Sequence, residues 1–282
     1  MDNKNWLITS AGVKMPRMIY GTAWKKERTG DLVRQAIKAG FRGIDTAGQP
    51  KHYNEPLIGE ALKMLQIEGL DREELFLQTK FTPLSGQDPD NIPYKEDASP
   101  DKQVEQSFES SLKNLQTMFI DSYVLHSPIS PMESLMEIWK AFEKLQQEER
   151  IGQLGISNCY NLEVLKALYE CAEVKPAVLQ NRFYRQTGYD KQLRRWCLDH
   201  GIVYQSFWSL TANPHILLSS EVQEIAQEYG KTSEQIFYRY LSQSNIVPLN
   251  GTTSLQHMKE DLSIFNFQLK NEELKEIDSL LL

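Results

Sequence analysis

The chain has 282 residues, of which 40% are hydrophobic and 24% are charged, a composition typical of a globular protein. Barrels of about 250 residues are common as single domains, so we expect residues 1–282 to form one domain. The formal net charge of -7 argues against wholesale binding of nucleic acid, which usually needs a basic face, and any anionic ligand would need a local positive site.

Short apolar runs alternate with amphipathic helical patterns along the chain. Strands that alternate with helices usually pair in parallel through right-handed crossovers. Eight such units predict a closed (β/α)8 TIM barrel of the α/β class, with an open doubly wound sheet as the alternative. Trp6–Thr9 and Val13–Met15, joined by Ser10-Ala11-Gly12, predict a β-hairpin before the barrel. The predicted barrel strands are Met18–Tyr20, Gly43–Asp45, Leu75–Lys80, Ile120–His126, Gln153–Ser157, Ala177–Asn181, Val203–Phe207 and Asn245–Leu249.

The segments between these strands carry helical signals. Ser99-Pro100 predicts a helix start, because serine caps helices and proline suits the first helical position. Gly152 and Gly201 are expected just past helix ends, where a left-handed residue is favoured. The segment Leu84–Ser99 predicts a long loop. Two apolar stripes predict buried helix faces, namely Val104, Phe108, Leu112 and Leu115, and then Leu135, Ile138, Trp139, Phe142 and Leu145.

The three cysteines, Cys159, Cys171 and Cys197, form no CxxC motif, and their odd number favours a reducing compartment over a disulfide framework. Cys171 and Cys197 occupy apolar helical positions and are expected to be buried thiols. Met1–Trp6 carries no export signal, and no apolar run approaches the roughly 20 residues needed to cross a bilayer. We therefore expect a cytoplasmic protein that binds neither membrane nor nucleic acid, with no metal site and no partner protein evident.

Titratable side chains gather at the predicted carboxyl ends of the strands, the edge where barrels of this kind carry their sites. Asp45, Lys80 and His126 end three successive strands, and Tyr53 follows the first of them. Each has an ordinary explanation alone: Asp45 as a helix cap, Lys80 in solvent, His126 hydrogen-bonded at a strand end. Together they would meet at one barrel mouth, which the separate explanations do not predict.

This set suits the reduction of a carbonyl group, which needs a hydride donor and a proton donor. The reference pKa of tyrosine is about 10, and a nearby ammonium favours the phenolate, so we expect Lys80 to lower the pKa of Tyr53. Asp45 would fix Lys80 and balance its charge. His126 would donate a hydrogen bond to the substrate oxygen, and Tyr53 would act as the general acid.

Longer motifs surround these residues. They are Gly43-Ile44-Asp45-Thr46-Ala47, Tyr53-Asn54-Glu55, Gly59-Glu60-Ala61-Leu62, Gln78-Thr79-Lys80, Asp121-Ser122-Tyr123-Val124-Leu125-His126 and Gly155-Ile156-Ser157-Asn158. Together they resemble the aldo-keto reductase family, from the N-terminal hairpin to about Leu280. The resemblance implies reduction of aldehydes or ketones to alcohols by the catalytic set Asp45, Tyr53, Lys80 and His126. It also implies a nicotinamide cofactor bound without a GxGxxG motif.

The cofactor that the resemblance implies is NADP(H), with NAD(H) as the alternative. Ser157, Asn158 and Gln180 would hold the nicotinamide carboxamide, and Phe207 would offer an aromatic face to the ring. A small carbonyl substrate would contact Trp24, Tyr53, His126 and Trp208. The full implied cofactor set is Gly21, Thr22, Asp45, Ser157, Asn158, Gln180, Phe207, Ser209, Leu210, Leu249, Gly251, Thr252, Thr253, His257, Glu260 and Asp261.

The chain departs from the family pattern near the substrate. The family tyrosine usually follows its aspartate by five residues, whereas Gly48–His52 lengthens that interval here. Asn54-Glu55 keeps the register and leaves Tyr53 as the assignment, and His52 could face the pocket. Phe207–Thr211 replaces a Tyr-Ser-Pro-Leu-Gly stretch. The chain ends at Leu282, where many relatives continue with a loop that walls the pocket, so we expect an open site.

A further departure concerns the phosphate-recognition segment. Leu249 and His257 stand where the family often has a lysine and an arginine. Thr252, Thr253 and Ser254 remain, and they are expected to cap a helix that begins near Leu255. A helix N-terminus offers free N–H groups and a positive dipole end to a phosphate. Ordinary helix capping is the alternative interpretation of this segment.

Two other functions compete with carbonyl reduction. One is a cofactor-binding regulatory protein of the same fold with little turnover, like the channel β subunits; the complete set of four residues argues against a dead site. The other is a different barrel enzyme, such as a sugar-phosphate isomerase, which would leave the ordered Asp–Tyr–Lys–His set unexplained.

Overall fold

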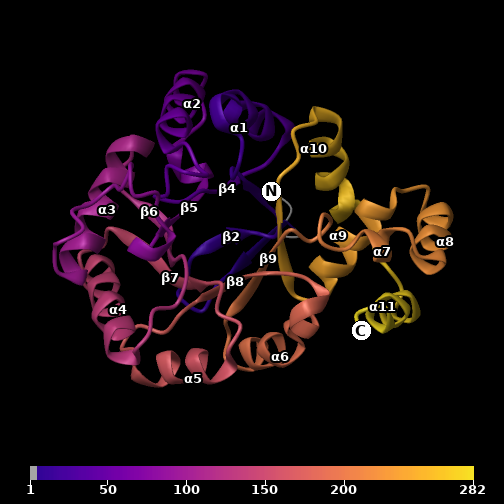
Figure 1. The fold of residues 1–282 in the computed structure, drawn as a ribbon. Coiled ribbons are helices and arrows are strands. Elements are labelled where there is room, and N and C mark those ends of the chain that lie inside the picture. The colour runs from indigo at the N-terminus through magenta and orange to yellow at the C-terminus, as the bar shows by residue number, and fades with distance from the viewer. Residues whose placement is uncertain (1–4) are drawn as a thin grey trace.

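The computed structural model describes residues 5–282, so most of the N-terminal segment Met1–Trp6 lies outside the described residues. Eight parallel strands close into a barrel in the order β10-β3-β4-β5-β6-β7-β8-β9, and helices surround it (Figure 1). Each predicted strand is confirmed to within two residues at either end, and the open-sheet alternative is excluded. The strands are β3 (Ile19–Gly21), β4 (Gly43–Asp45), β5 (Phe76–Phe81), β6 (Ile120–Leu125), β7 (Ile151–Ser157), β8 (Val178–Arg182), β9 (Val203–Phe207) and β10 (Ile246–Asn250).

The helices form an outer ring around the strands (Figure 1). Both predicted apolar stripes are buried, one on α3 and one on α4. Pro100 opens α3 after Ser99, although the Ser99 side chain makes no capping hydrogen bond. The helices are α1 (Thr29–Ala39), α2 (Glu55–Ile67), α3 (Pro100–Leu115), α4 (Met132–Gln147), α5 (Leu162–Cys171), α6 (Lys191–Asp199), α7 (Pro214–Leu217), α8 (Ser220–Tyr229), α9 (Ser233–Gln243), α10 (Leu255–Leu262) and α11 (Asn271–Ser279). Short 3-10 turns are η2 (Lys26–Arg28), η3 (Arg72–Glu74), η4 (Leu84–Gly86), η5 (Arg185–Asp190) and η6 (Ser263–Asn266).

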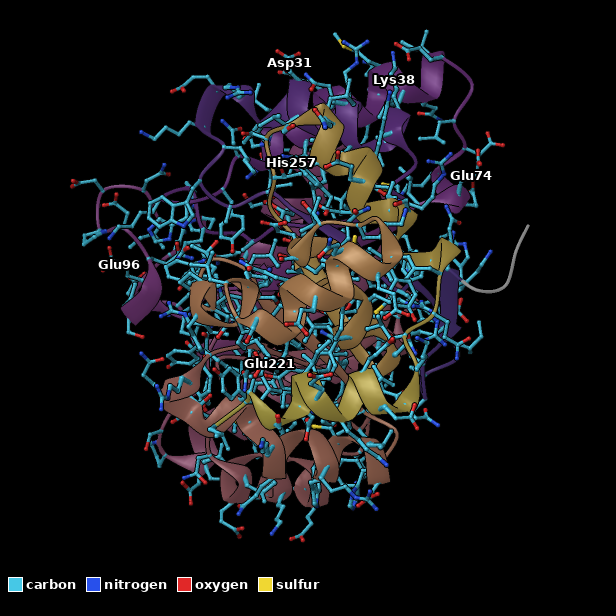
Figure 2. All side chains as sticks on the ribbon, turned by 90° about the vertical axis from the view of Figure 1, so that its right-hand side faces the viewer. Asp31, Lys38, Glu74, Glu96, Glu221 and His257 are labelled. Atoms are coloured by element: carbon cyan, nitrogen blue, oxygen red, sulfur yellow. The ribbon has the colours of Figure 1, made fainter. Side chains whose placement is uncertain are left out.

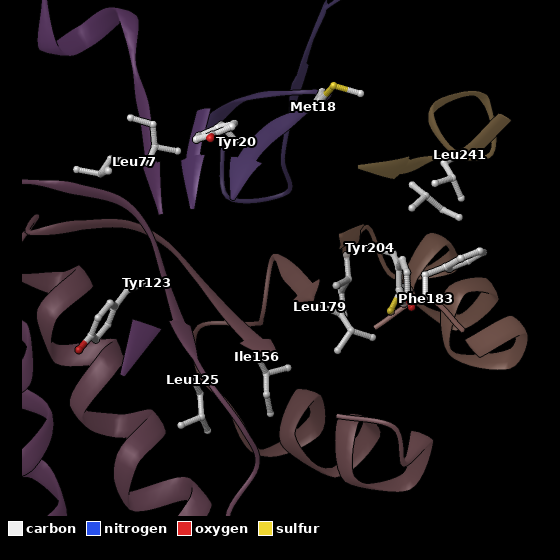
Figure 3. Packing of buried hydrophobic residues seen from close by; sticks show 14 of the residues in the cluster. Met18, Tyr20, Leu77, Tyr123, Leu125, Ile156, Leu179, Phe183, Tyr204 and Leu241 are labelled. Carbon is white, nitrogen blue, oxygen red and sulfur yellow. The ribbon is translucent and has the colours of Figure 1, made fainter. Parts of the chain in front are cut away.

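The main apolar core lies between the strands and the helices. Successive residues of a strand point to opposite faces, so one set of each strand meets the helices. Tyr123, Leu125 and Ile156 belong to this outward set and are completely buried (Figure 3). Burial of large apolar side chains of this kind stabilises the fold by about 1.5–3 kcal/mol each.

The inward-facing residues fill the barrel, and many of them are polar. The Gln78 amide nitrogen donates to Gln205 Oε1 at 2.8 Å, and Gln180 donates to the same oxygen at 2.9 Å. Gln153 Oε1 accepts a hydrogen bond from Thr9 Oγ1 at 2.6 Å. Because these buried amides are bonded to one another, the barrel interior holds a layer of fixed dipoles below the mouth.

The predicted hairpin is present as β1 (Trp6–Ile8) paired antiparallel with β2 (Lys14–Pro16). Met15 is completely buried in a small apolar cluster with residues such as Phe76 and Val178, which begin or nearly begin their strands. The hairpin therefore covers the amino-terminal end of the barrel.

Two local predictions are wrong. Gly152 lies inside β7 rather than past a helix, and the left-handed residue after α4 is Glu149, at φ 57°. The close approach of the chain explains the glycine, because a Cβ there would lie 2.8 Å from Asp121 O. Cys171 is exposed, because it is the last residue of α5 and lies to one side of the face that carries the buried Leu168, whereas Cys197 is buried as expected. Gly201 adopts the expected left-handed conformation at φ 70°.

Candidate active site

One cavity of about 700 Å³ opens at the carboxyl ends of the strands. Its wall combines strand ends with the loop that leads into α10. Most residues of the predicted cofactor, substrate and catalytic sets line it. They are Gly21, Trp24, Asp45, Tyr53, His126, Ser157, Asn158, Gln180, Phe207, Trp208, Ser209, Leu210, Leu249, Gly251, Thr252, His257, Glu260 and Asp261.

Three residues of the predicted sets do not line the cavity. Thr22 is buried beside it, where its Oγ1 donates to the Asp45 backbone oxygen at 2.8 Å. Lys80 is buried behind Asp45, so it does not lean into solvent. Thr253 is exposed outside the cavity. The first two are placed to support the wall rather than to touch a ligand.

Asp45 and Lys80 form a buried ion pair. Lys80 Nζ lies 2.7 Å from each Asp45 carboxylate oxygen and 2.7 Å from Thr46 O, so all three ammonium donors are used. Asp45 Oδ1 also accepts from the amides of Gln78 and Gln180, at 2.8 and 3.0 Å. These hydrogen bonds hold the ammonium of Lys80 and the carboxylate of Asp45 in fixed positions. Asp45 is thus part of an ion pair and does not cap a helix.

Tyr53 is held at the cavity by the lengthened loop before α2. Gly48 pairs with Phe81 of β5, where a Cβ would lie 3.2 Å from Lys80 O, so the insertion follows the strand closely. The Tyr53 N–H then donates to Gln49 O at 3.1 Å, and Asn54 caps α2 through its side chain. The insertion thus leaves Tyr53 beside the ion pair, with Lys80 Nζ 5.4 Å from the centre of its ring.

The protonation of Tyr53 differs from the sequence-based expectation. Burial, together with the negative charge of Asp45, raises the pKa of the Tyr53 phenol. Lys80 does not offset this rise, because its three donors point to Asp45 and Thr46 rather than to the phenol. Tyr53 therefore remains a neutral phenol across the neutral pH range.

His126 lies beside Tyr53 in the cavity wall, with the two ring centres 6.0 Å apart in an edge-to-face arrangement. Its Nδ1 lies 2.6 Å from Thr82 Oγ1, and its backbone N–H donates to Phe81 O at 2.9 Å. Nε2 has no hydrogen-bond partner within residues 5–282. Burial and the nearby Lys80 lower the pKa of His126 to about 3, so the ring is neutral and Nε2 is available to a ligand.

The low pKa of His126 makes folding sensitive to acid. An unfolded histidine titrates at about 6.5, so the unfolded state binds more protons than the folded state between that pH and about 3. The free energy of unfolding should therefore decrease as the pH is lowered. This residue alone should account for a loss of about 1–2 kcal/mol between pH 7 and pH 5. Urea unfolding of the wild type and of His126→Gln at both pH values measures the difference. An equal loss of stability in the two proteins would contradict the assignment.

The residues proposed to hold a carboxamide are fixed by one another. Ser157 Oγ donates to Gln180 O at 2.7 Å, and Asn158 Nδ2 donates to His126 O at 2.8 Å. Asn158 adopts a left-handed conformation at φ 54° and does not cap α5, because that cap is Asn161. Among the described residues, Gln180 Oε1 accepts no hydrogen bond, and Ser157 Oγ accepts only a long one, at 3.3 Å from Asn158 Nδ2. Both oxygens can therefore accept a hydrogen bond from an amide.

The predicted phosphate segment forms the N-terminus of α10. Ser254 caps the helix by accepting from the His257 N–H at 3.3 Å, and Thr252 Oγ1 accepts from the Ser254 N–H. His257 lies on the first turn and is exposed (Figure 2). Burial raises the pKa of Asp261 to about 6, which reduces the negative charge near this helix end in mild acid.

Several residues outside the predicted sets also line the cavity, and three of them, Lys25, Gln49 and Arg182, bear on the site. Lys25 donates to Gly251 O and brings an ammonium to the phosphate segment. Gln49 bonds His52 Nδ1 at 2.8 Å, and His52, also in the cavity wall, lies against Trp24 with ring centres 3.8 Å apart. Arg182 ends β8 two residues after Gln180, and the period-two rule for strands could have placed it on the same face.

Residues 5–282 contain neither a membrane-spanning helix nor a metal-binding cluster. No helix between residues 5 and 282 is long and apolar enough to cross a membrane. Within the same residues, no group of three or more histidine, cysteine, aspartate or glutamate side chains is arranged to hold a metal ion.

Comparisons with known proteins agree with this architecture. The model of the Aldo/keto reductase family matches residues 17–282. Glyoxal reductase of Bacillus subtilis (strain 168) is 31% identical over 272 residues, which cover 95% of this chain and 90% of that protein. Among solved structures, MGS-M4, an aldo-keto reductase from a Medee basin deep-sea metagenome library, superposes with a TM-score of 0.83 at 27% identity, covering 97% of this chain and 94% of that one.

A second solved structure, the aldo-keto reductase AKR2E5 complexed with NADPH, has a TM-score of 0.81 and 26% identity. The alignment covers 97% of this chain and 86% of that one. The family model, the relative and the two structures extend over nearly the whole chain, including every strand of the barrel. The chain therefore belongs to the aldo/keto reductase family.

Proposed function

We propose that the chain reduces aldehydes or ketones to alcohols with a nicotinamide cofactor, and that Tyr53 is the general acid. The buried Asp45–Lys80 pair beside Tyr53, with neutral His126 facing them, is the observation that carries the proposal. The relative named glyoxal reductase supports a carbonyl substrate.

Each residue of the set has a distinct task. Tyr53 donates its proton to the carbonyl oxygen as negative charge develops there, and its raised pKa keeps that proton in place beforehand. An alkoxide is a far stronger base than a phenolate, so this transfer remains favourable. His126 orients the same oxygen through Nε2, and Asp45–Lys80 fixes the position of Tyr53. A reduced nicotinamide, when bound, would supply the hydride.

The residues present fit a nicotinamide cofactor. Ser157, Asn158 and Gln180 offer oxygen atoms and amides to a carboxamide, and the Phe207 ring lines the same cavity. The N-terminus of α10, with Lys25 nearby, suits a phosphate. The solved structure with NADPH supports NADP(H) as the cofactor, with NAD(H) as the alternative.

Cofactor choice should depend on pH. Burial raises the pKa of Asp261 to about 6, so its carboxylate loses negative charge as the pH falls and repels the cofactor's 2′-phosphate less. We expect the ratio of kcat/KM for NADPH to that for NADH to rise about twofold from pH 8 to pH 6. His257→Arg should raise the ratio about tenfold at pH 8, because arginine binds phosphate bidentately.

Asp261→Asn is the matched control for the pH dependence. It should abolish most of that dependence, because the side chain then has no carboxylate to lose its charge near pH 6. A ratio that is the same at both pH values, or a preference for NADH, would show that α10 does not recognise the phosphate.

The direct test of the proposed function is loss of reduced-cofactor absorbance with NADPH or NADH and a panel of aldehydes that includes glyoxal and methylglyoxal. Turnover of any carbonyl supports it. Tight cofactor binding with no turnover across the panel would favour a regulatory protein of the same fold instead.

The wider setting follows from the same observations. The family match over residues 17–282 supports one domain for the chain as a whole. Cys159, Cys171 and Cys197 are free, which suits a reducing cytoplasm. The proposed partner is a small carbonyl compound.

A further inference from the structure

We propose that Arg182 binds a carboxylate group of the substrate, so that the preferred substrates are aldehydes or ketones that also carry an acid group. The inference rests on the proposed function and specifies its substrate class. It assigns a role to a charged residue that the carbonyl-reducing set does not use.

Arg182 is the last residue of β8 and lines the cavity that contains Tyr53 and His126. Residues two apart on a strand share a face, so Arg182 follows Gln180 into the mouth of the barrel. Its side chain is half-buried, which places a positive charge in the wall of the cavity rather than on the outer surface.

The guanidinium has no partner among the described residues. Its nitrogen atoms donate no hydrogen bond, no carboxylate of residues 5–282 lies within 4.0 Å of it, and its Nε is fully buried without an acceptor. A buried N–H without an acceptor is unfavourable. The two Nη groups of Arg182 also lack an acceptor among the described residues and are not buried, so a ligand in the cavity can supply one to them.

Two aromatic rings position the guanidinium. Arg182 Cζ lies 4.2 Å from the centre of the Trp208 ring and 5.3 Å from that of Tyr184. Stacking uses the faces of the planar group and leaves the N–H donors along its edge free. Those donors match the two oxygens of a carboxylate, which arginine binds in pairs.

Hydrogen bonds connect this position to the proposed reacting end. The Arg182 backbone N–H donates to Tyr160 Oη at 3.1 Å, and that hydroxyl donates to Asn158 Oδ1 at 3.3 Å. Asn158 in turn donates to the backbone oxygen of His126. Arg182 also lines the same cavity as Tyr53 and His126, so a substrate whose carbonyl meets those two residues can present its acid group to Arg182.

The surrounding charge favours this assignment. The chain has a net charge of -7, so an anionic substrate needs a local positive group to enter. The charge of Lys80 is already paired with Asp45, and Lys25 bonds Gly251 near α10. Arg182 is the cation that remains unpaired in the part of the wall formed by β8 and β9, within the described residues.

The test compares para-carboxybenzaldehyde with its neutral methyl ester at saturating NADPH. The wild type should prefer the acid by about tenfold or more in kcat/KM, mostly through KM, because the contact is made by the ground state as well. Arg182→Gln should lose that preference with less than a twofold change for the ester, and Arg182→Lys should retain part of it. Arg185→Gln, an exposed arginine three residues further on, is the matched control and should match the wild type.

Other results would overturn the inference. Equal losses for acid and ester in Arg182→Gln would assign Arg182 to packing. A large rise in the Kd for NADPH, measured by quenching of tryptophan fluorescence, would assign it to a cofactor phosphate. If the wild type reduces neither compound and no aldehyde of the panel with glyoxal and methylglyoxal, the proposed function fails by itself. Calorimetric binding of para-hydroxymethylbenzoate then tests Arg182 independently: binding weakened tenfold in Arg182→Gln supports the inference, and unchanged binding contradicts it.

Discussion

Tyr53→Phe is expected to lower kcat for carbonyl reduction by about 10²-fold or more, the usual scale for loss of an acid–base group. The substitution removes only the hydroxyl, and the ring keeps its place near Lys80 and His126. Cofactor affinity should hardly change, because the loss falls on the transition state. Steady-state kinetics with one aldehyde, together with a Kd for NADPH, measure both quantities.

The dependence of wild-type kcat on pH gives a second test of the role of Tyr53. Since burial and Asp45 raise the pKa of Tyr53, its proton is present throughout the neutral range. The wild-type kcat for reduction should therefore show no inflection from Tyr53 between pH 6 and pH 9. Tyr94, whose hydroxyl donates to Thr82 O away from the cavity, provides a control in Tyr94→Phe, which should keep most of its turnover. A Tyr53→Phe variant with near-normal kcat would remove Tyr53 from the mechanism.

Lys80→Met is expected to cost about 3–5 kcal/mol of stability, the scale seen when one partner of a buried ion pair is removed. Lys80 and Asp45 are 1% and 2% exposed, so the remaining carboxylate would have no solvent to replace the ammonium. It would keep only the amides of Gln78 and Gln180, and Thr46 O would lose its donor. Denaturant unfolding curves measure the loss.

The matched control is Lys144→Met. Lys144 is exposed and lies 3.9 Å from Glu148, so its removal should change stability by no more than about 0.5 kcal/mol. The double variant Asp45→Asn/Lys80→Met should recover part of the loss, because it no longer buries an unpaired charge. A loss in Lys80→Met as small as that in Lys144→Met would show that the pair does not hold the site together.

The sequence predicts the barrel well because short apolar runs alternate with helical stripes, and that alternation admits few topologies. Asp45, Lys80 and His126 were expected to converge for the same reason: parallel strands bring their carboxyl ends to one edge. The direction of the Tyr53 pKa shift was wrong, because it depends on where three donors point. One of those donors meets Thr46 O, a contact across 34 residues that no local pattern encodes.

Other omissions have the same origin. Lys25 reaches the cavity through Gly251, 226 residues away in the chain, and nothing near Lys25 in the sequence marks that pairing. Arg182 was missed by one residue, since the predicted strand stopped at Asn181. Cys171 was predicted to be buried because helical spacing indicates which side of a helix is apolar. Whether a residue is buried also depends on whether another element covers that side of the helix.

The hairpin limits how ligands enter and leave the barrel. Pro16 and Val13 lie so close to the first residues of β4 and β7 that a Cβ at Gly43 would be 2.5 Å from Pro16 Cγ, and one at Gly152 would be 3.1 Å from Val13 Cγ2. Met15 is buried below the inward-facing glutamines, with its sulfur 3.3 Å from Gln205 Nε2. The barrel is thus a cup with one rim rather than a tube with two. In a site with a single opening, the ligand that binds deepest must bind first and leave last, because a ligand bound above it blocks the opening. Cofactor and carbonyl compound would share that single rim, and the order in which they come and go is then set by depth rather than by affinity.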